Sequence, residues 1–231
     1  MESRIPTPLN TGSTLALGQN RVLRNTYALL AISMVPTVLG AWIGVATGFN
    51  IFKLGHPAIG FIVFMAAAFG FIFAIEKTKN SAAGVPVLLA FTFFMGLMLS
   101  AMLTHIMTFR NGASLIGLAF GGTAAIFIGM ATWASTIKRD LSGMGKALMI
   151  GVIMLIVAGF ANIFLQLPGL MIAISVIAIG IFSAFLLYDL NRIMMGGETN
   201  YITATLAVYL DLFNIFQNLL ALLGIFGGDR D

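Results

Sequence analysis

The chain has 231 residues, of which 59% are hydrophobic and only 9% are charged, and its mean hydropathy is +1.02. Since a soluble globular domain carries about 25% charged residues, this composition excludes a soluble protein and predicts a polytopic membrane protein. The absence of cysteine excludes disulfides, thiolate metal ligands and a cysteine nucleophile. A net charge of +4 does not indicate nucleic acid, because the basic residues fall between apolar runs, where membrane topology requires them.

Seven apolar runs are long enough to cross a bilayer, because a hydrocarbon core about 30 Å thick needs roughly 20 helical residues. They cover residues 25–46, 57–75, 82–109, 113–137, 145–167, 169–193 and 201–226. The sequence therefore predicts an all-α fold, a single seven-helix transmembrane bundle over 25–226 in a lipid bilayer. An N-terminal tail over 1–24, polar and mobile in residues 1–20, precedes the bundle, and a short tail over 227–231 follows it.

The lysines and arginines predict the orientation of this bundle. Nine of the twelve lie in the N-terminal segment and in the connections around 76–81, 138–146 and 192–200, and three lie on the opposite side. Because basic residues are retained on the cytoplasmic side, we expect the N-terminus in the cytoplasm. An odd number of spans then places the C-terminus on the far side of the membrane.

Two pairs of glycines predict close contacts between helices. Gly40-x-x-x-Gly44 lies in the first apolar run and Gly117-x-x-x-Gly121 in the fourth. Small residues at this spacing let helices approach closely in lipid, where burial supplies no hydrophobic driving force. We therefore expect both pairs to lie at helix contacts.

Ionisable residues stand inside two of the apolar runs. Asp189 and Arg192 belong to the stretch YDLNRI, and Asp211 belongs to VYLDLF. A charge at the bilayer centre costs about 2.5–3.5 kcal/mol on insertion scales, so such groups usually face the bundle interior or a wet cavity and indicate function. Counted from the Gly196-Gly197 turn at 1.5 Å per residue, the two aspartates lie roughly 10 and 15 Å deep. Two antiparallel neighbours would bring them to a similar depth.

The polar residues near these aspartates predict further contacts. Arg192 lies on the same helical face as Asp189, and we expect it to pair with Asp189, with Asp211, or with each in turn. Asp211, Asn214 and Asn218 recur at i, i+3 and i+7. This spacing predicts one polar stripe on the last helix, facing Asp189.

The two aspartates suggest a switch that responds to pH. Two carboxyl groups in contact at a poorly hydrated site cannot easily both ionise, so we expect them to share a proton near physiological pH. Arg192 acts in the opposite sense and favours the ionised groups. Loss of the shared proton would replace a hydrogen bond by repulsion and push the last two helices apart. A permanent Asp-Arg-Asp cluster that only fixes the helix register remains the alternative.

The motifs of known membrane enzymes are missing from the chain. Presenilin-like aspartyl proteases carry Gly-x-Gly-Asp and Pro-Ala-Leu around the second aspartate, and Asp211 has neither. His105 has no Gly-x-Ser-Gly companion for a rhomboid-like serine protease, and no His-Glu-x-x-His metal motif is present. The sequence therefore predicts a protein that is not an enzyme and carries no cofactor or metal.

Four segments carry a resemblance to a known family. They are VLRNTY at 22–27, GGTA at 121–124, ANIFLQLP at 161–168 and GGETNYI at 196–202. In these segments the chain resembles the Bax inhibitor-1 family of seven-helix membrane proteins, and specifically its bacterial, YccA-like branch. The resemblance implies a bacterial inner-membrane protein in which six helices surround a seventh.

The same resemblance implies a mechanism for the aspartates. In this family an acidic pair on the sixth and seventh helices acts as a pH-sensitive latch over a calcium leak path, and Asp189 and Asp211 fall at those positions. The family's latch can also involve a basic residue in the second helix. No basic residue stands in the run 57–75, so we infer that Arg192 takes its place.

A second implied role is the regulation of a protease. YccA-like proteins associate with FtsH, a membrane-anchored ATP-dependent protease, as a substrate that resists extraction and so restrains it. The N-terminal tail would serve as the handle. The resemblance thus implies an FtsH modulator, with a pH-gated calcium or cation leak as the alternative, and the two roles are compatible.

Overall fold

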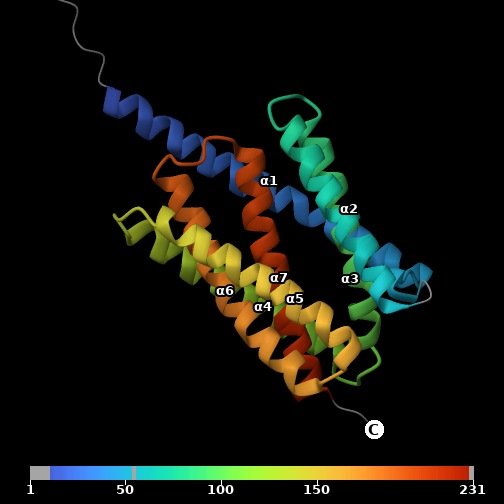
Figure 1. The fold of residues 1–231 in the computed structure, drawn as a ribbon. Helices are drawn as coiled ribbons and strands as arrows, with labels where there is room; N and C mark the ends of the chain where they lie inside the picture. The colour runs from blue at the N-terminus through green and yellow to red at the C-terminus, as the bar shows by residue number, and fades with distance from the viewer. Residues whose placement is uncertain (1–10, 54–55, 229–231) are drawn as a thin grey trace, which may run out of the picture.

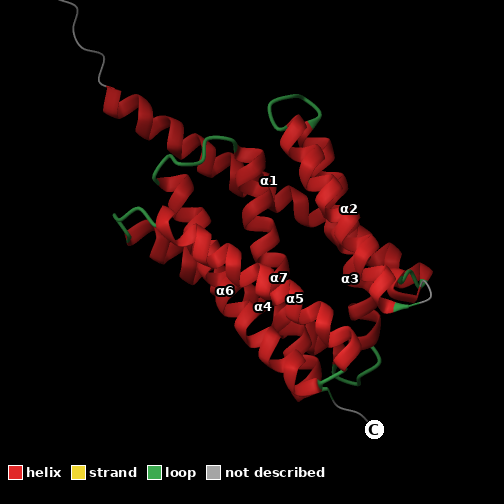
Figure 2. Cartoon of the chain, in the orientation of Figure 1, coloured by secondary structure: helices red, strands yellow, loops and turns green. Residues whose placement is uncertain are grey.

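The described part of the chain is helical almost throughout. In the computed structural model it comprises residues 11–53 and 56–228, with residues 11–20 and 52 described through their backbone alone. The elements in chain order are α1 (Thr11–Thr47), η1 (Ile51–Lys53), α2 (Pro57–Thr78), α3 (Gly84–Ile106), α4 (Gly112–Thr136), η2 (Ser142–Met144), α5 (Gly145–Leu165), α6 (Pro168–Met194) and α7 (Tyr201–Gly227). Within these residues there is no strand (Figure 2). Seven helices are long and apolar enough to cross a membrane, so the predicted seven-helix membrane fold is confirmed.

The predicted spans agree with the helices to within a few residues, except at α1. This helix begins at Thr11 rather than near residue 25, although its membrane span starts at Arg21. Residues 11–20 of the predicted tail are helical and continue α1, so this part of the tail has regular secondary structure. Residues 1–10 of that tail lie outside the described residues.

Helix α7 lies at the centre of the bundle. It packs against α1, α2, α3, α4 and α6 (Figure 1), and it supplies several of the largest fully buried side chains, Tyr209 and Ile215 among them. Helix α5 packs mainly on α6, touches α2, and buries no residue of its own. The bundle is thus built around α7, as the family resemblance implies, with α5 on its outer surface.

The contact between α1 and α3 depends on glycine. A Cβ added at Gly40 would collide with the carbonyl of Phe93, and one added at Gly96 with the carbonyl of Thr37. The prediction for Gly40-x-x-x-Gly44 is confirmed. The prediction for Gly117 and Gly121 is wrong, since a Cβ built at either position has no heavy atom of another described helix within 4 Å. Spacing alone does not reveal which face of α4 meets a neighbour.

The connections fall at two ends of the bundle, because the helices alternate in direction. The α6–α7 end holds the start of α1 and the α2–α3, α4–α5 and α6–α7 connections, toward the top and left in Figure 1. The α5–α6 end holds the remaining connections and the end of α7, at the lower right. The predicted polar residues lie between these two ends.

Candidate functional site

The two aspartates come from neighbouring antiparallel helices near the α6–α7 end. Asp189 lies five residues before the end of α6 at Met194, and Asp211 lies ten residues after α7 begins at Tyr201. At 1.5 Å per residue these positions are about 7 and 15 Å from the connection. The side chains of Asp189 and Asp211 approach within hydrogen-bonding reach of each other. The structure therefore brings together two carboxyl groups for which the sequence predicts a similar depth but leaves the contact open.

Asp211 is the more deeply buried member of this pair. Its side chain is only 4% exposed, and its Oδ2 atom is buried without a hydrogen-bond partner among the described residues. A buried carboxylate oxygen without a donor is costly. Since ionised carboxylates only accept hydrogen bonds, one proton shared with Asp189 would supply the missing donor. The geometry is compatible with a carboxyl pair that holds a single proton.

A small cavity connects Asp189 to the α6–α7 connection. Its volume is about 20 Å³, which is room for about one water molecule. It is lined by Asp189, Arg192, Ile193, Glu198, Ala204 and Ala207. Asp189 reaches this cavity and Asp211 does not line it, so the two carboxyl groups have different access to water.

Arg192 does not form the predicted ion pair with an aspartate. Its Nη2 lies 3.6 Å from Oε2 of Glu198, and its Nε donates to the carbonyl of Gly197 at 3.3 Å. Within the described part of the chain, no ion pair joins it to Asp189 or Asp211. The physical reason is position: Arg192 stands in the last turn of α6, where a long basic side chain extends toward the aqueous end of a helix.

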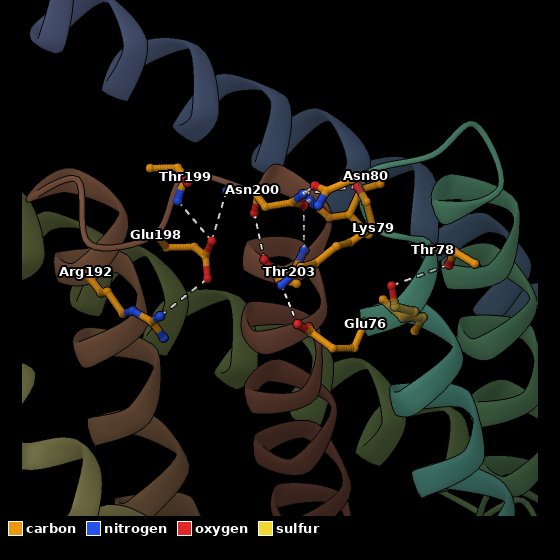
Figure 3. Close-up of polar contacts among 11 residues, drawn as sticks. Glu76, Thr78, Lys79, Asn80, Arg192, Glu198, Thr199, Asn200 and Thr203 are labelled. Atoms are coloured by element: carbon orange, nitrogen blue, oxygen red, sulfur yellow. Dashed lines mark hydrogen bonds and ion pairs between the residues drawn. The ribbon is translucent and has the colours of Figure 1, made fainter.

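The turn after α6 fixes the position of the Glu198 side chain. Gly196 adopts a φ of +77°, which glycine allows without strain, and the N–H of Gly197 donates to the carbonyl of Arg192 at 2.8 Å. This geometry ends α6 and places the carboxylate of Glu198 beside two backbone N–H groups. Its Oε1 accepts from Thr199 and Asn200, both at 2.9 Å, as Figure 3 shows. Glu198 thus fixes the connection as well as pairing with Arg192.

Asn200 joins the α6–α7 connection to the α2–α3 turn. Its Oδ1 accepts from the N–H of Ile202 at 2.9 Å and caps α7. Its Nδ2 donates to the carbonyl of Lys79 at 3.1 Å and to Oδ1 of Asn80 at 2.9 Å (Figure 3). Lys79 is itself ion-paired with Glu76 at the end of α2. The role of Asn200 as a cap could have been predicted from an asparagine that directly precedes an apolar run.

Asn191 fixes the end of α6 to the α4–α5 connection. This side chain, 1% exposed, accepts from the N–H of Leu141 at 3.1 Å and donates to the carbonyl of Arg139 at 3.2 Å. Sequence reasoning did not single out Asn191, although it lies in YDLNRI. An asparagine in an apolar run indicates that its side chain has a polar partner. The sequence does not identify that partner, because it lies about fifty residues away in the chain.

The predicted stripe on α7 leads away from Asp189. Asn214 and Asn218 are half-buried, and their Nδ2 groups donate to the carbonyls of Leu210 and Asn214, each at 2.8 Å. Asn218 lines a second cavity, of about 530 Å³, toward the α5–α6 end. Of the three stripe residues only Asp211 is placed against Asp189, because the helix rises about 10 Å between positions 211 and 218. The stripe instead extends from the carboxyl pair to the larger cavity.

Metal binding has no support in the described residues. Over 11–53 and 56–228, no three histidine, aspartate or glutamate side chains are grouped so that they could hold a metal ion. The site is therefore a pair of carboxyl groups with a neighbouring Arg192–Glu198 ion pair. Its available chemistry is the holding and release of a proton.

Known proteins resemble this chain over most of its length. The family model described as "Inhibitor of apoptosis-promoting Bax1" matches residues 19–228. The "Modulator of FtsH protease YccA" of Escherichia coli is 37% identical over 216 residues, which cover 94% of this chain and 95% of that protein. An uncharacterized protein of Neisseria meningitidis is 35% identical over 214 residues, with 92% and 94% of the two chains covered. The chain has seven membrane-length helices in a bundle centred on α7, and the family model matches it over nearly its whole length. This protein belongs to the Bax inhibitor-1 family.

Proposed function

We propose that this protein is a bacterial inner-membrane partner of an FtsH-type protease, which it restrains by binding rather than by catalysis. The observation that carries the proposal is its similarity, 37% identity over 94% of the chain, to a protein named as a modulator of FtsH. The distribution of lysine and arginine supports an N-terminus in the cytoplasm and a C-terminus in the periplasm. In this orientation the start of α1 lies on the cytoplasmic side.

The packing of α1 gives a physical reason for the restraint. The helix extends to Thr11, beyond its membrane span that starts at Arg21, so a protease could grip the N-terminal segment. Pulling on it would have to separate α1 from α3, whose backbones meet at Gly40 and Gly96. Close packing of this kind resists extraction because many contacts must be lost together.

Deletion of residues 2–10 tests this proposal. The variant and the wild type would be compared for co-purification with FtsH and for the degradation rate of an independent FtsH substrate. We expect the deletion to abolish both co-purification and inhibition. Deletion of 229–231 at the other terminus serves as the control and should change neither. Inhibition that persists without residues 2–10 would contradict the role of these residues as the handle.

A second function is favoured by the carboxyl pair: a pH-gated leak for calcium or another cation. The supporting observation is the buried, unpartnered Oδ2 of Asp211 beside Asp189. The pair stands between the small cavity near the α6–α7 end and the large cavity toward the α5–α6 end. The charged groups nearest to it are Arg192 and Glu198. A change in protonation would alter the contact between α6 and α7 and so open or close a path.

Calcium flux into liposomes loaded with a calcium-sensitive dye tests the leak. Wild-type protein, Asp211→Asn and the exposed control Asp140→Asn would be compared between pH 5 and 8. We expect flux that titrates with pH in the wild type and in Asp140→Asn, and a flat profile in Asp211→Asn. Wild-type flux no greater than that of empty liposomes would remove the leak. The two functions separate cleanly, since deletion of 2–10 should spare flux and Asp211→Asn should spare binding to the protease.

A further inference from the structure

The large cavity near the α5–α6 end has the size and chemistry of a ligand site. Its volume of about 530 Å³ falls within the range of roughly 300–1,000 Å³ that is usual for small-molecule sites. Four helices, α3, α5, α6 and α7, contribute to its wall. It is separate from the carboxyl pair, because neither Asp189 nor Asp211 lines it.

The wall of this cavity is apolar with a few polar groups. Methionine and isoleucine side chains form much of it, and the polar groups are His105, Asn162, Ser175, Gln217 and Asn218. Each of the four helices supplies at least one of these polar groups. No aspartate, glutamate, lysine or arginine lines the cavity. Such a wall favours a ligand with an uncharged, hydrogen-bonding head and an apolar body.

No hydrogen bond within the described residues accounts for the burial of Ser175. It is 3% exposed, yet its hydroxyl makes no hydrogen bond to any described residue. The seven other buried serines and threonines each donate to a backbone carbonyl of their own helix: Thr26, Ser33, Thr37, Thr92, Ser100, Thr123 and Thr205. Buried polar groups are normally satisfied, so the hydroxyl of Ser175, which lines the cavity, is available to bond a group inside it.

Two asparagines keep further hydrogen-bonding capacity in the cavity. Asn162 uses its Oδ1 to accept from the N–H of Leu167 at 3.0 Å, which leaves its amide hydrogens available. Asn218 uses its Nδ2 to donate to the carbonyl of Asn214, which leaves its Oδ1 available. With Ser175, these groups offer donors and an acceptor, the pattern that a hydroxylated head group needs.

The cavity reaches the outer surface of the bundle. Met171 and Ile225 line it and are also 44% and 42% exposed. On the α5 side, Phe164 stacks on His56 with ring centroids 5.7 Å apart, and Phe160 packs at a tilt against Phe61 of α2 with ring centroids 5.6 Å apart. An amphiphile from the surrounding leaflet can therefore enter from the side of the bundle. We propose that this cavity binds a neutral bilayer amphiphile with a hydroxylated head, of the monoacylglycerol class.

Native mass spectrometry of the full-length protein with monoolein as the probe tests the site. We expect retention of one monoolein and weak retention of lysophosphatidylglycerol, whose head is charged. Gly159 lines the cavity, and a Cβ built there has no atom within 4 Å, so Gly159→Leu should fill the space and weaken binding at least tenfold. The matched control Gly180→Leu, on an exposed and equally open position of α6, should bind as the wild type does.

Ser175→Ala keeps the test decisive if Gly159→Leu fails to fold. It removes one hydroxyl and adds no bulk, and loss of one hydrogen bond should weaken monoolein binding about fivefold. The proposal would be overturned by an absence of monoolein binding to the wild type, or by equal binding to Gly159→Leu once this variant is shown to be folded. Equal retention of the charged lysolipid would also overturn it, because the cavity would then not discriminate against a charged head group.

Discussion

The hydroxyl groups of Tyr209 on α7 and Thr37 on α1 lie 2.9 Å apart, and both side chains are buried. The hydroxyl of Tyr209 also donates to the carbonyl of Thr92 on α3 at 3.4 Å. One side chain of the central helix is thereby bonded to two surrounding helices. Tyr209 stands two residues before Asp211, so this bond helps to fix the part of α7 that carries the carboxyl pair.

Tyr209→Phe should lower the free energy of unfolding by about 0.5–1.5 kcal/mol. The ring and its packing remain, and only a buried hydrogen bond is lost. Unfolding by SDS in mixed micelles would measure the change. Tyr27→Phe is the matched control, since the Tyr27 hydroxyl has no hydrogen bond among the described residues, and it should be neutral. Equal stability of Tyr209→Phe and the wild type would show that the bond to Thr37 contributes nothing.

Gly96→Ala and Gly117→Ala should change stability in opposite directions. At Gly96 the added methyl would collide with the carbonyl of Thr37 on α1, and forced repacking of this kind costs about 1–3 kcal/mol. At Gly117 the methyl meets open space, so the helix gains up to about 1 kcal/mol from the better propensity of alanine. Thermal unfolding of both variants in detergent would measure the difference. Destabilisation by Gly117→Ala would indicate that a further chain packs on α4.

The sequence was sufficient for the spans and for the similar depth of the two aspartates, because both depend on local features. A run of some twenty apolar residues leaves the chain few alternatives in a bilayer. Two acidic residues at similar depth on consecutive antiparallel helices then have few places to lie except against each other. The depth arithmetic for Asp189 and Asp211 uses only helical rise and the position of the turn, and it does not by itself establish that the two side chains touch.

The partner of Arg192 could not be predicted in the same way. Its i+3 spacing from Asp189 describes the helix face, but a long side chain near a helix end can extend toward water instead. Whether it does so depends on Glu198, whose position is fixed by the positive φ of Gly196 and by two backbone N–H groups. The links made by Asn191 and Asn200 were missed for a similar reason, since their partners belong to distant connections. Contacts between connections produce no periodic pattern of residues in the sequence, so they cannot be predicted from helical spacing.

Glu198→Ala should destabilise the protein, whereas Arg192→Gln should not. Arg192 and Glu198 are joined at 3.6 Å with the arginine side chain 44% exposed, and exposed ion pairs contribute at most about 1 kcal/mol. Glu198 also accepts two backbone hydrogen bonds, so its loss should cost about 1–2 kcal/mol. Glu198→Gln keeps a carbonyl oxygen for those bonds and should resemble the wild type in SDS unfolding. A loss of stability in Arg192→Gln equal to that in Glu198→Ala would show that the ion pair is the main contribution.

Asn200 makes two separable contributions, and two substitutions distinguish them. Asn200→Ser keeps an N-cap oxygen for α7 and loses the amide that donates to Lys79 and Asn80. Asn200→Ala loses both. We expect destabilisation of about 1 kcal/mol for the serine variant and about 2 kcal/mol for the alanine variant.

Hydrogen exchange at the α2–α3 turn tests the link through Asn200 directly. Both variants should exchange faster than the wild type at the N–H groups of Ser81 and Gly84, which are bonded to Thr78 and Ser81 within the turn. Exchange that is faster only in Asn200→Ala would mean that capping of α7, rather than the side-chain amide, holds the turn. In that case α2 and α7 are joined only by packing. If both variants respond, Asn200 couples the α2–α3 turn to the segment that carries Glu198, and through Glu198 to the small cavity at Asp189.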